Sequence, residues 1–169
     1  MESRAKILGH AVHPILIVFP LGLLATAVVF DLVHMITGGA VYATVAFWML
    51  AAGLIGGLLA APFGLWDWLA IPSNTRAKSI GLIHALANGT ALVLFFISWW
   101  IRYNAPDRPS TLAFVIALAG AVMALVGGWF GGELVERLGV GVDEGANLDA
   151  PSSLSHSTAH STRAAANKS

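Results

Sequence analysis

Long apolar runs dominate the pattern of this chain. Four runs rich in Leu, Ala, Val and Ile cover residues 14–35, 40–61, 80–101 and 112–132. A bilayer core roughly 30 Å thick is spanned by about 20 apolar residues in helical form. Only helices and closed barrels satisfy their own backbone hydrogen bonds in lipid, and barrel strands would be shorter and would alternate. The pattern therefore predicts four membrane-spanning helices.

The connections between the runs are short, which makes consecutive helices antiparallel neighbours. This favours an all-α, up-down-up-down four-helix bundle, with residues 1–142 as the transmembrane domain. The longer segment 62–79 is expected to lie along the membrane interface. Beyond Gly145 the composition changes to Ala, Ser, Thr, Asn and His, which cannot bury enough surface to fold alone. Residues 143–169 are therefore predicted to form a polar, flexible tail.

Composition excludes several classes of protein. Only 11% of the residues are charged, whereas a soluble domain has about a quarter. Nine basic residues balance nine acidic ones, so no basic surplus is available for nucleic-acid phosphates. The absence of cysteine excludes disulfides, thiolate metal sites and cysteine nucleophiles. The chain also has no hydrolase, Walker or dinucleotide-binding motif, so we expect no enzymatic activity.

The basic residues near the runs predict the orientation. Arg102 and Arg108 lie on one side of the predicted membrane, and five basic residues lie on the other: Arg4, Lys6, Arg76, Lys78 and Arg137. Because cytoplasmic loops carry the excess of Lys and Arg, both termini are predicted to be cytoplasmic.

Small residues follow one face of two predicted helices. Gly53 and Gly57 lie on the second, and the fourth carries an i, i+4 series of Gly120, Ala124, Gly128 and Gly132. Small residues let membrane helices approach closely, so the first interpretation is tight helix packing. A second interpretation is that these faces make room for a flat cofactor such as a porphyrin. Spacing alone does not separate the two.

Polar groups inside a membrane are costly and are therefore functional candidates. Six of them fall at the predicted cytoplasmic level of the bundle: His10, His13, Asp67, His84, Glu133 and Glu136. They could form a hydrogen-bonded polar cap that ties the helix ends together. They could form a metal site, for zinc or non-haem iron, from His10, His13, Asp67, His84 and Glu133. They could also hold a b-type haem, with His13 and His84 as axial ligands.

Three stretches of the chain resemble one bacterial family of predicted membrane proteins, the domain of unknown function 2231. They are GHAVHPILIVFPLGL (residues 9–23), GLWDWLAIPSNTRAKSIGLIHALAN (64–88) and GGELVERLGVGV (131–142). The resemblance covers all four predicted helices and implies a multi-pass protein of the bacterial inner membrane. The family has no established activity to carry over. Its motifs include His13, Asp67, His84 and Glu133, all from the polar cluster.

Two functions follow as hypotheses. The first is a non-catalytic accessory subunit that packs against other membrane proteins in a larger respiratory, photosynthetic or transport complex. The second is an electron-transfer protein that binds b-type haem or a metal ion through the histidine and carboxylate cluster. Transport is ranked last, because few polar residues continue from this cluster toward Asp31 across the bilayer.

Overall fold

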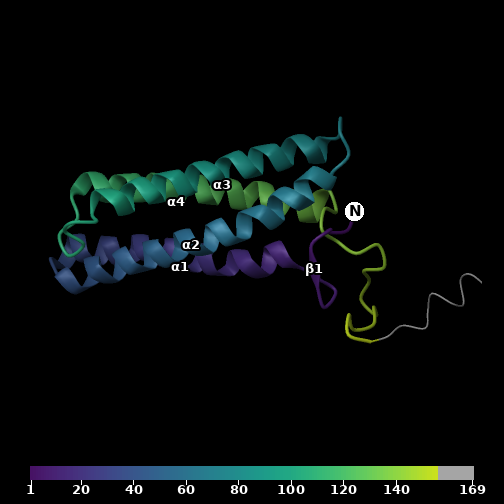
Figure 1. Cartoon of the computed structure of the whole chain (residues 1–169), viewed down its shortest axis with the longest axis horizontal. Helices are drawn as coiled ribbons and strands as arrows, with labels where there is room; N and C mark the ends of the chain where they lie inside the picture. The colour runs from purple at the N-terminus through teal and green to yellow at the C-terminus, as the bar shows by residue number, and fades with distance from the viewer. Residues whose placement is uncertain (156–169) are drawn as a thin grey trace, which may run out of the picture.

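The computed structural model describes residues 1–155 and is dominated by four long helices (Figure 1). They are α1 (Val12–Thr37), α2 (Ala40–Ala70), α3 (Arg76–Ile101) and α4 (Thr111–Gly132). A short π-helix, η1 (Glu133–Arg137), continues α4. All four helices are long and apolar enough to cross a membrane. The predicted all-α bundle of four spanning helices is confirmed. The division at residue 142 stays a prediction, and residues 156–169 of the expected tail lie outside the described part.

The second helix is longer than predicted. The sequence suggested an interfacial segment from Pro62 onward, but α2 continues through Pro62 to Ala70. A proline removes one backbone donor without necessarily ending a helix. The end of α2 is tied to α3 by Trp68, whose Nε1 donates to the Lys78 carbonyl over 3.1 Å, while Lys78 Nζ donates to the Trp68 carbonyl over 2.7 Å. These bonds stabilise the short connection between α2 and α3. Because α2 extends to Ala70, Asp67 lies on this helix.

The N-terminal segment lies across one end of the bundle. Strands β1 (Lys6–Ile7) and β2 (His10–Ala11) form a small antiparallel hairpin. Its two turn residues, Leu8 and Gly9, both have positive φ. Met1 contacts the segment after η1, since its amino group donates to the Gly139 carbonyl over 2.9 Å. Figure 1 shows the N-terminus at the same end of the bundle as the chain that leaves α4.

The bundle is apolar outside and rich in small residues inside. Large side chains such as Val18, Leu58 and Leu125 are more than half exposed on the helix surfaces, as suits contact with lipid. The buried core contains Leu24, Leu50 and Phe95 together with several alanines. Close helix packing in lipid depends on such small residues rather than on hydrophobicity.

The buried face of α4 follows a seven-residue pattern, not the i, i+4 series expected from sequence. Its buried residues are Ala113, Ala117, Gly120 and Gly127. A Cβ atom placed on Gly128 or Gly132 would have no neighbour within 4 Å. These two glycines therefore face away from the other helices of the chain. Repeated steps of four residues rotate around a helix of 3.6 residues per turn, whereas alternating steps of four and three stay on one face.

The helices form two equivalent hairpins. The first hairpin (α1 and α2) and the second hairpin (α3 and α4) each pack extensively within themselves and less against each other. Each buried residue of α1 has a buried counterpart at one constant offset, either in α3 or at the residue that caps its C-terminus: Pro20, Leu24, Ala27 and Asp31 correspond to Ala91, Phe95, Ser98 and Arg102. The buried residues of α4 all have buried counterparts in α2, also at one offset: Ala46, Leu50, Gly53 and Ala60. The two hairpins thus bury several residues at matching positions.

Candidate functional site

His13 begins α1 and is held by α2. Its Nδ1 lies 3.0 Å from the Ala60 carbonyl oxygen. One turn further along α2, Gly64 makes room for the imidazole, because a Cβ atom there would lie 2.8 Å from His13 Cε1. A carbonyl oxygen only accepts hydrogen bonds, so Nδ1 carries the proton and donates it. In neutral His13 the lone pair is therefore on Nε2.

His84 repeats this arrangement in the second hairpin. Its Nδ1 lies 2.8 Å from the Gly127 carbonyl oxygen on α4, and a Cβ atom on Gly131 would lie 3.0 Å from His84 Cε1. Asn88, one turn along α3, donates from Nδ2 to the His84 carbonyl over 2.8 Å. The shorter contact of His84 Nδ1 is to the Gly127 carbonyl, which only accepts, whereas Asn88 Nδ2 lies farther away at 3.4 Å. His84 therefore also carries its proton on Nδ1 and its lone pair on Nε2.

The two histidines meet between the hairpins. Their ring centroids are 6.4 Å apart and their planes are inclined by 83°. Among residues 1–155, no hydrogen-bond partner is found for Nε2 of either ring. An imidazole that donates from one nitrogen to a backbone carbonyl and leaves the other free is the form that commonly ligates metals. We call this part of the bundle the histidine end.

Asp67 does not join the histidine pair. Its carboxylate accepts hydrogen bonds from Ser3 Oγ over 2.7 Å and from the backbone N–H groups of Arg4 and Ala5 over 2.7 and 3.4 Å. A carboxylate that accepts several such bonds is well satisfied without a metal. In this structure Asp67 fastens the N-terminal segment to α2.

The remaining members of the predicted cluster are also separate. Glu133 forms an ion pair with Arg76, and His10 Nε2 lies 3.2 Å from Ser153 Oγ. The described residues contain no group of three or more His, Cys, Asp or Glu side chains that could hold a metal ion. The structure thus does not bring His10, His13, Asp67, His84 and Glu133 together, and it leaves His13 and His84 as a pair.

The buried glycines face side chains of other helices. A Cβ atom on Gly53 would lie 2.7 Å from Leu24, one on Gly57 would lie 2.6 Å from Leu92, and one on Gly120 would lie 3.2 Å from Phe95. Ala124 lies half-buried on the same face of α4 as Gly120. At these three glycines the space is filled by side chains of neighbouring helices.

Sequence reasoning missed the strongest polar contact. Arg102 Nη1 and Nη2 donate to the two Asp31 carboxylate oxygens over 2.7 and 3.0 Å, and Nη2 also lies 2.9 Å from Ser98 Oγ. Both charged residues are only 1% exposed. The sequence pattern places Arg102 just outside the third predicted helix, where it counts only toward the predicted orientation of the chain in the membrane. A usable signal was present, because Asp31 and Arg102 are separated by the same number of residues as His13 and His84.

The comparisons with known proteins identify a family but no activity. No curated protein and no solved structure matches the chain. The model of one family, described as predicted membrane protein (DUF2231), matches residues 9–144 and so includes all four helices and the histidine pair. The chain therefore belongs to the DUF2231 family of predicted membrane proteins.

Proposed function

We propose that this membrane protein transfers electrons through a b-type haem, held between the two hairpins by His13 and His84. The observation that carries the proposal is the pair of neighbouring imidazoles, each fixed by a backbone carbonyl of its own hairpin and each with no hydrogen-bond partner at Nε2 among residues 1–155. When bound, the haem would supply an iron ion that accepts and releases one electron.

The number of ligands favours haem over a bare metal ion. A structural zinc site needs four protein ligands and a catalytic one needs three. The described part of the chain brings together two histidines but no third His, Cys, Asp or Glu. Haem needs only the two axial ligands, because the porphyrin supplies the other four.

The geometry supports the same choice. Because a metal–imidazole bond is about 2 Å long, two imidazoles on opposite sides of one metal have ring centres roughly 6 Å apart. The observed separation is 6.4 Å. Room for the macrocycle has to come from the interface between the hairpins, which is less extensively packed than either hairpin. If both termini are cytoplasmic, His13 and His84 would hold a haem toward the cytoplasmic side of the inner membrane.

The optical spectrum of the full-length protein tests this proposal. We expect a Soret band, one haem per chain by pyridine haemochrome assay, and loss of both in His13→Ala and His84→Ala. His10→Ala is the matched control and should keep the haem, because His10 is exposed on strand β2 of the N-terminal segment. A protein with neither a Soret band nor stoichiometric metal contradicts the proposal. Stoichiometric metal without a Soret band replaces haem by a bare metal site.

A second candidate is an accessory subunit of a larger membrane complex. The observation that favours it is a set of glycines that face open space on the outer surfaces of the helices: Gly22, Gly89, Gly128 and Gly132. Such positions allow a helix of another protein to approach closely. Native gels in mild detergent test this role. The wild type should migrate in a larger assembly and Gly128→Leu/Gly132→Leu should not, whereas a wild type that remains monomeric contradicts it.

A further inference from the structure

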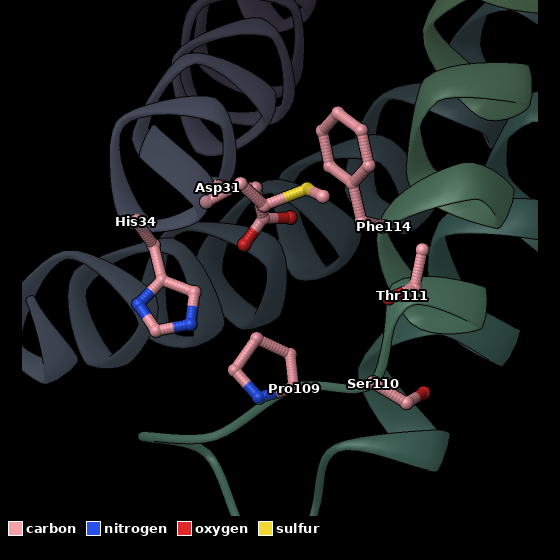
Figure 2. A pocket seen from close by; sticks show the side chains of 7 residues that line it. Asp31, His34, Pro109, Ser110, Thr111 and Phe114 are labelled. Atoms are coloured by element: carbon pink, nitrogen blue, oxygen red, sulfur yellow. The ribbon is translucent and has the colours of Figure 1, made fainter. Parts of the chain in front are cut away.

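A second polar site lies at the opposite end of the bundle from the histidine pair. We call it the ion-pair end, because it contains Asp31 and Arg102. A cavity of about 170 Å³ opens there between α1 and the start of α4. Figure 2 shows Asp31 and His34 on the α1 side of the cavity, opposite Pro109, Ser110, Thr111 and Phe114.

The cavity interrupts the equivalence of the two hairpins. At the offset that relates α4 to α2, the counterpart of Phe114 is Phe47. At the offset that relates α1 to α3, the counterpart of His34 is Ala105. Phe47 stacks on Trp99 at 5.5 Å and lies 6.3 Å from the Tyr103 ring, so aromatic side chains fill that interface. Phe114 has no aromatic partner within residues 1–155. One of two equivalent places is therefore packed with aromatic rings, and the other is an open space lined by polar groups.

The polar wall of the cavity offers hydrogen-bond acceptors. His34 Nδ1 lies 3.1 Å from the Gly39 carbonyl oxygen and donates to it, which leaves the lone pair of neutral His34 on Nε2. Figure 2 shows the second ring nitrogen on the Pro109 side of the imidazole. Each Asp31 oxygen accepts one bond from Arg102, and a carboxylate has room for about four. Because Arg102 balances the charge of Asp31, these acceptors suit a neutral donor better than a cation.

The remaining walls and the size of the cavity suit an aromatic ring. Pro109 and Phe114 contribute flat apolar surfaces, and Met35 contributes a thioether that packs well against aromatic groups. A cavity of roughly 150 Å³ accommodates a benzene-sized molecule. We propose that this cavity binds a hydroxyl-bearing aromatic ring, a phenol or a quinol headgroup, whose hydroxyl donates to His34 Nε2 or to the Asp31 carboxylate. The proposal does not depend on the haem.

Binding to the full-length protein in nanodiscs tests the proposal, with empty nanodiscs as the blank for partitioning into lipid. The probe is hydroquinone, measured by saturation-transfer NMR and by calorimetry. The comparison compound is 1,4-dimethoxybenzene, which keeps the ring but lacks a hydroxyl donor. We expect saturable binding of hydroquinone and at least tenfold weaker binding of the dimethoxy compound.

The decisive variant is His34→Phe, which keeps a ring but removes the acceptor. Hydroquinone should bind it at least tenfold more weakly than the wild type. The same exchange at the surface residue His10 should leave binding unchanged. Thr111→Trp, which fills the cavity but spares His34 and Asp31, is the second variant and should also abolish binding.

A decyl-substituted hydroquinone identifies the source of the ligand. Tighter binding than that of hydroquinone indicates a quinol that enters from the membrane, and equal binding indicates a soluble phenol. The proposal is overturned if hydroquinone does not saturate the wild type, if His34→Phe binds it equally well, or if anilinium binds more tightly than hydroquinone.

Discussion

At the residue scale, the glycines of this protein divide into two groups by what surrounds them. Gly64 and Gly131 leave space for the imidazoles of His13 and His84, so each glycine shapes the site through the volume it does not occupy. Gly128 lies only three positions from Gly131, but it faces open space. The identity of the residue is the same, and the direction it faces on the helix decides its role.

Alanine substitution distinguishes the two groups. Gly64→Ala and Gly131→Ala place a methyl group against a histidine ring and should destabilise the protein by about 1–3 kcal/mol, the usual cost of overpacking. Gly128→Ala and Gly132→Ala should instead stabilise the protein by about 0.5–1 kcal/mol, because alanine meets no neighbour there and favours the helix more than glycine. Thermal unfolding in detergent, followed by circular dichroism, measures both pairs. Equal effects in the two pairs would show that the imidazoles do not use this space.

At the element scale, the ends of the helices are fastened by polar contacts outside the bundle core. Asp67, at the end of α2, holds the first residues of the chain, and Trp68 holds the start of α3. The segment after η1 is held by Lys6, which forms ion pairs with Glu2 and Asp143. These contacts give Asp67 and Trp68 of the GLWDW motif structural roles at the end of α2.

Removal of the Asp67 charge should release the N-terminal segment. In Asp67→Asn the side chain has one carbonyl oxygen in place of a carboxylate, so it cannot accept all three bonds from Ser3, Arg4 and Ala5 with the same strength. Hydrogen exchange at the Arg4 and Ala5 amides should become faster, with little change in the helix cores. Asp149→Asn is the control, because Asp149 lies far from this contact in sequence and is exposed. Unchanged exchange at these two amides contradicts the anchoring role.

The contact between the N-terminal segment and residues 143–144 should depend on pH. The pKa of Glu2 is lowered, first by the hydrogen bond from Lys6 and then by the N–H of Glu144. The pKa of Lys6 is raised, mainly by its hydrogen bond to Asp143. The stability that the Glu2 contacts contribute is therefore complete above the ordinary Glu2 pKa of 4.5. It is lost as the pH falls through the lower pKa of the folded state. The Lys6 contribution is complete below 10.5 and is lost as the pH rises through the higher folded value.

NMR of the Glu144 amide measures the acidic side of this window. Its N–H lies 3.2 Å from Glu2 Oε1, so its chemical shift should follow the protonation of Glu2 below pH 4.5. Glu2→Gln should abolish that titration. A Glu144 shift that still titrates in the variant would assign the change to another group.

At the scale of the whole molecule, two hairpins of equivalent packing are joined by two polar pairs at equivalent positions. The His13 and His84 pair lies at one end, and the Asp31 and Arg102 pair lies at the other. The ion pair is buried and doubly hydrogen-bonded, whereas the two histidines are not bonded to each other. We therefore expect the ion pair, and not the histidines, to determine how the two hairpins pack against each other.

Exchange of the two charges tests the equivalence of the hairpins. Asp31→Asn or Arg102→Met leaves one buried charge unpaired and should cost about 3–5 kcal/mol. The double variant Asp31→Arg/Arg102→Asp should recover much of this loss. Recovery should be greater when Ala27→Ser and Ser98→Ala move the supporting hydroxyl to the equivalent position. Thermal unfolding measures all variants. If the exchanged proteins are no more stable than the single variants, the two positions are not equivalent.

The sequence by itself determined the four spanning helices and the all-α class. The reason is that the requirement to fill a bilayer with apolar, internally hydrogen-bonded backbone acts locally along each run. It also singled out His13 and His84 as potential ligands. Only the tertiary structure decided which polar residues meet, because a partner depends on the direction each side chain faces and not on its depth alone. Depth in the membrane predicted Asp67 and Glu133 beside the histidines. In the structure, Asp67 accepts a hydrogen bond from Ser3, and Glu133 forms an ion pair with Arg76. It pairs Asp31 with Arg102, which adjoin different loops and which only the packing of the two hairpins brings together.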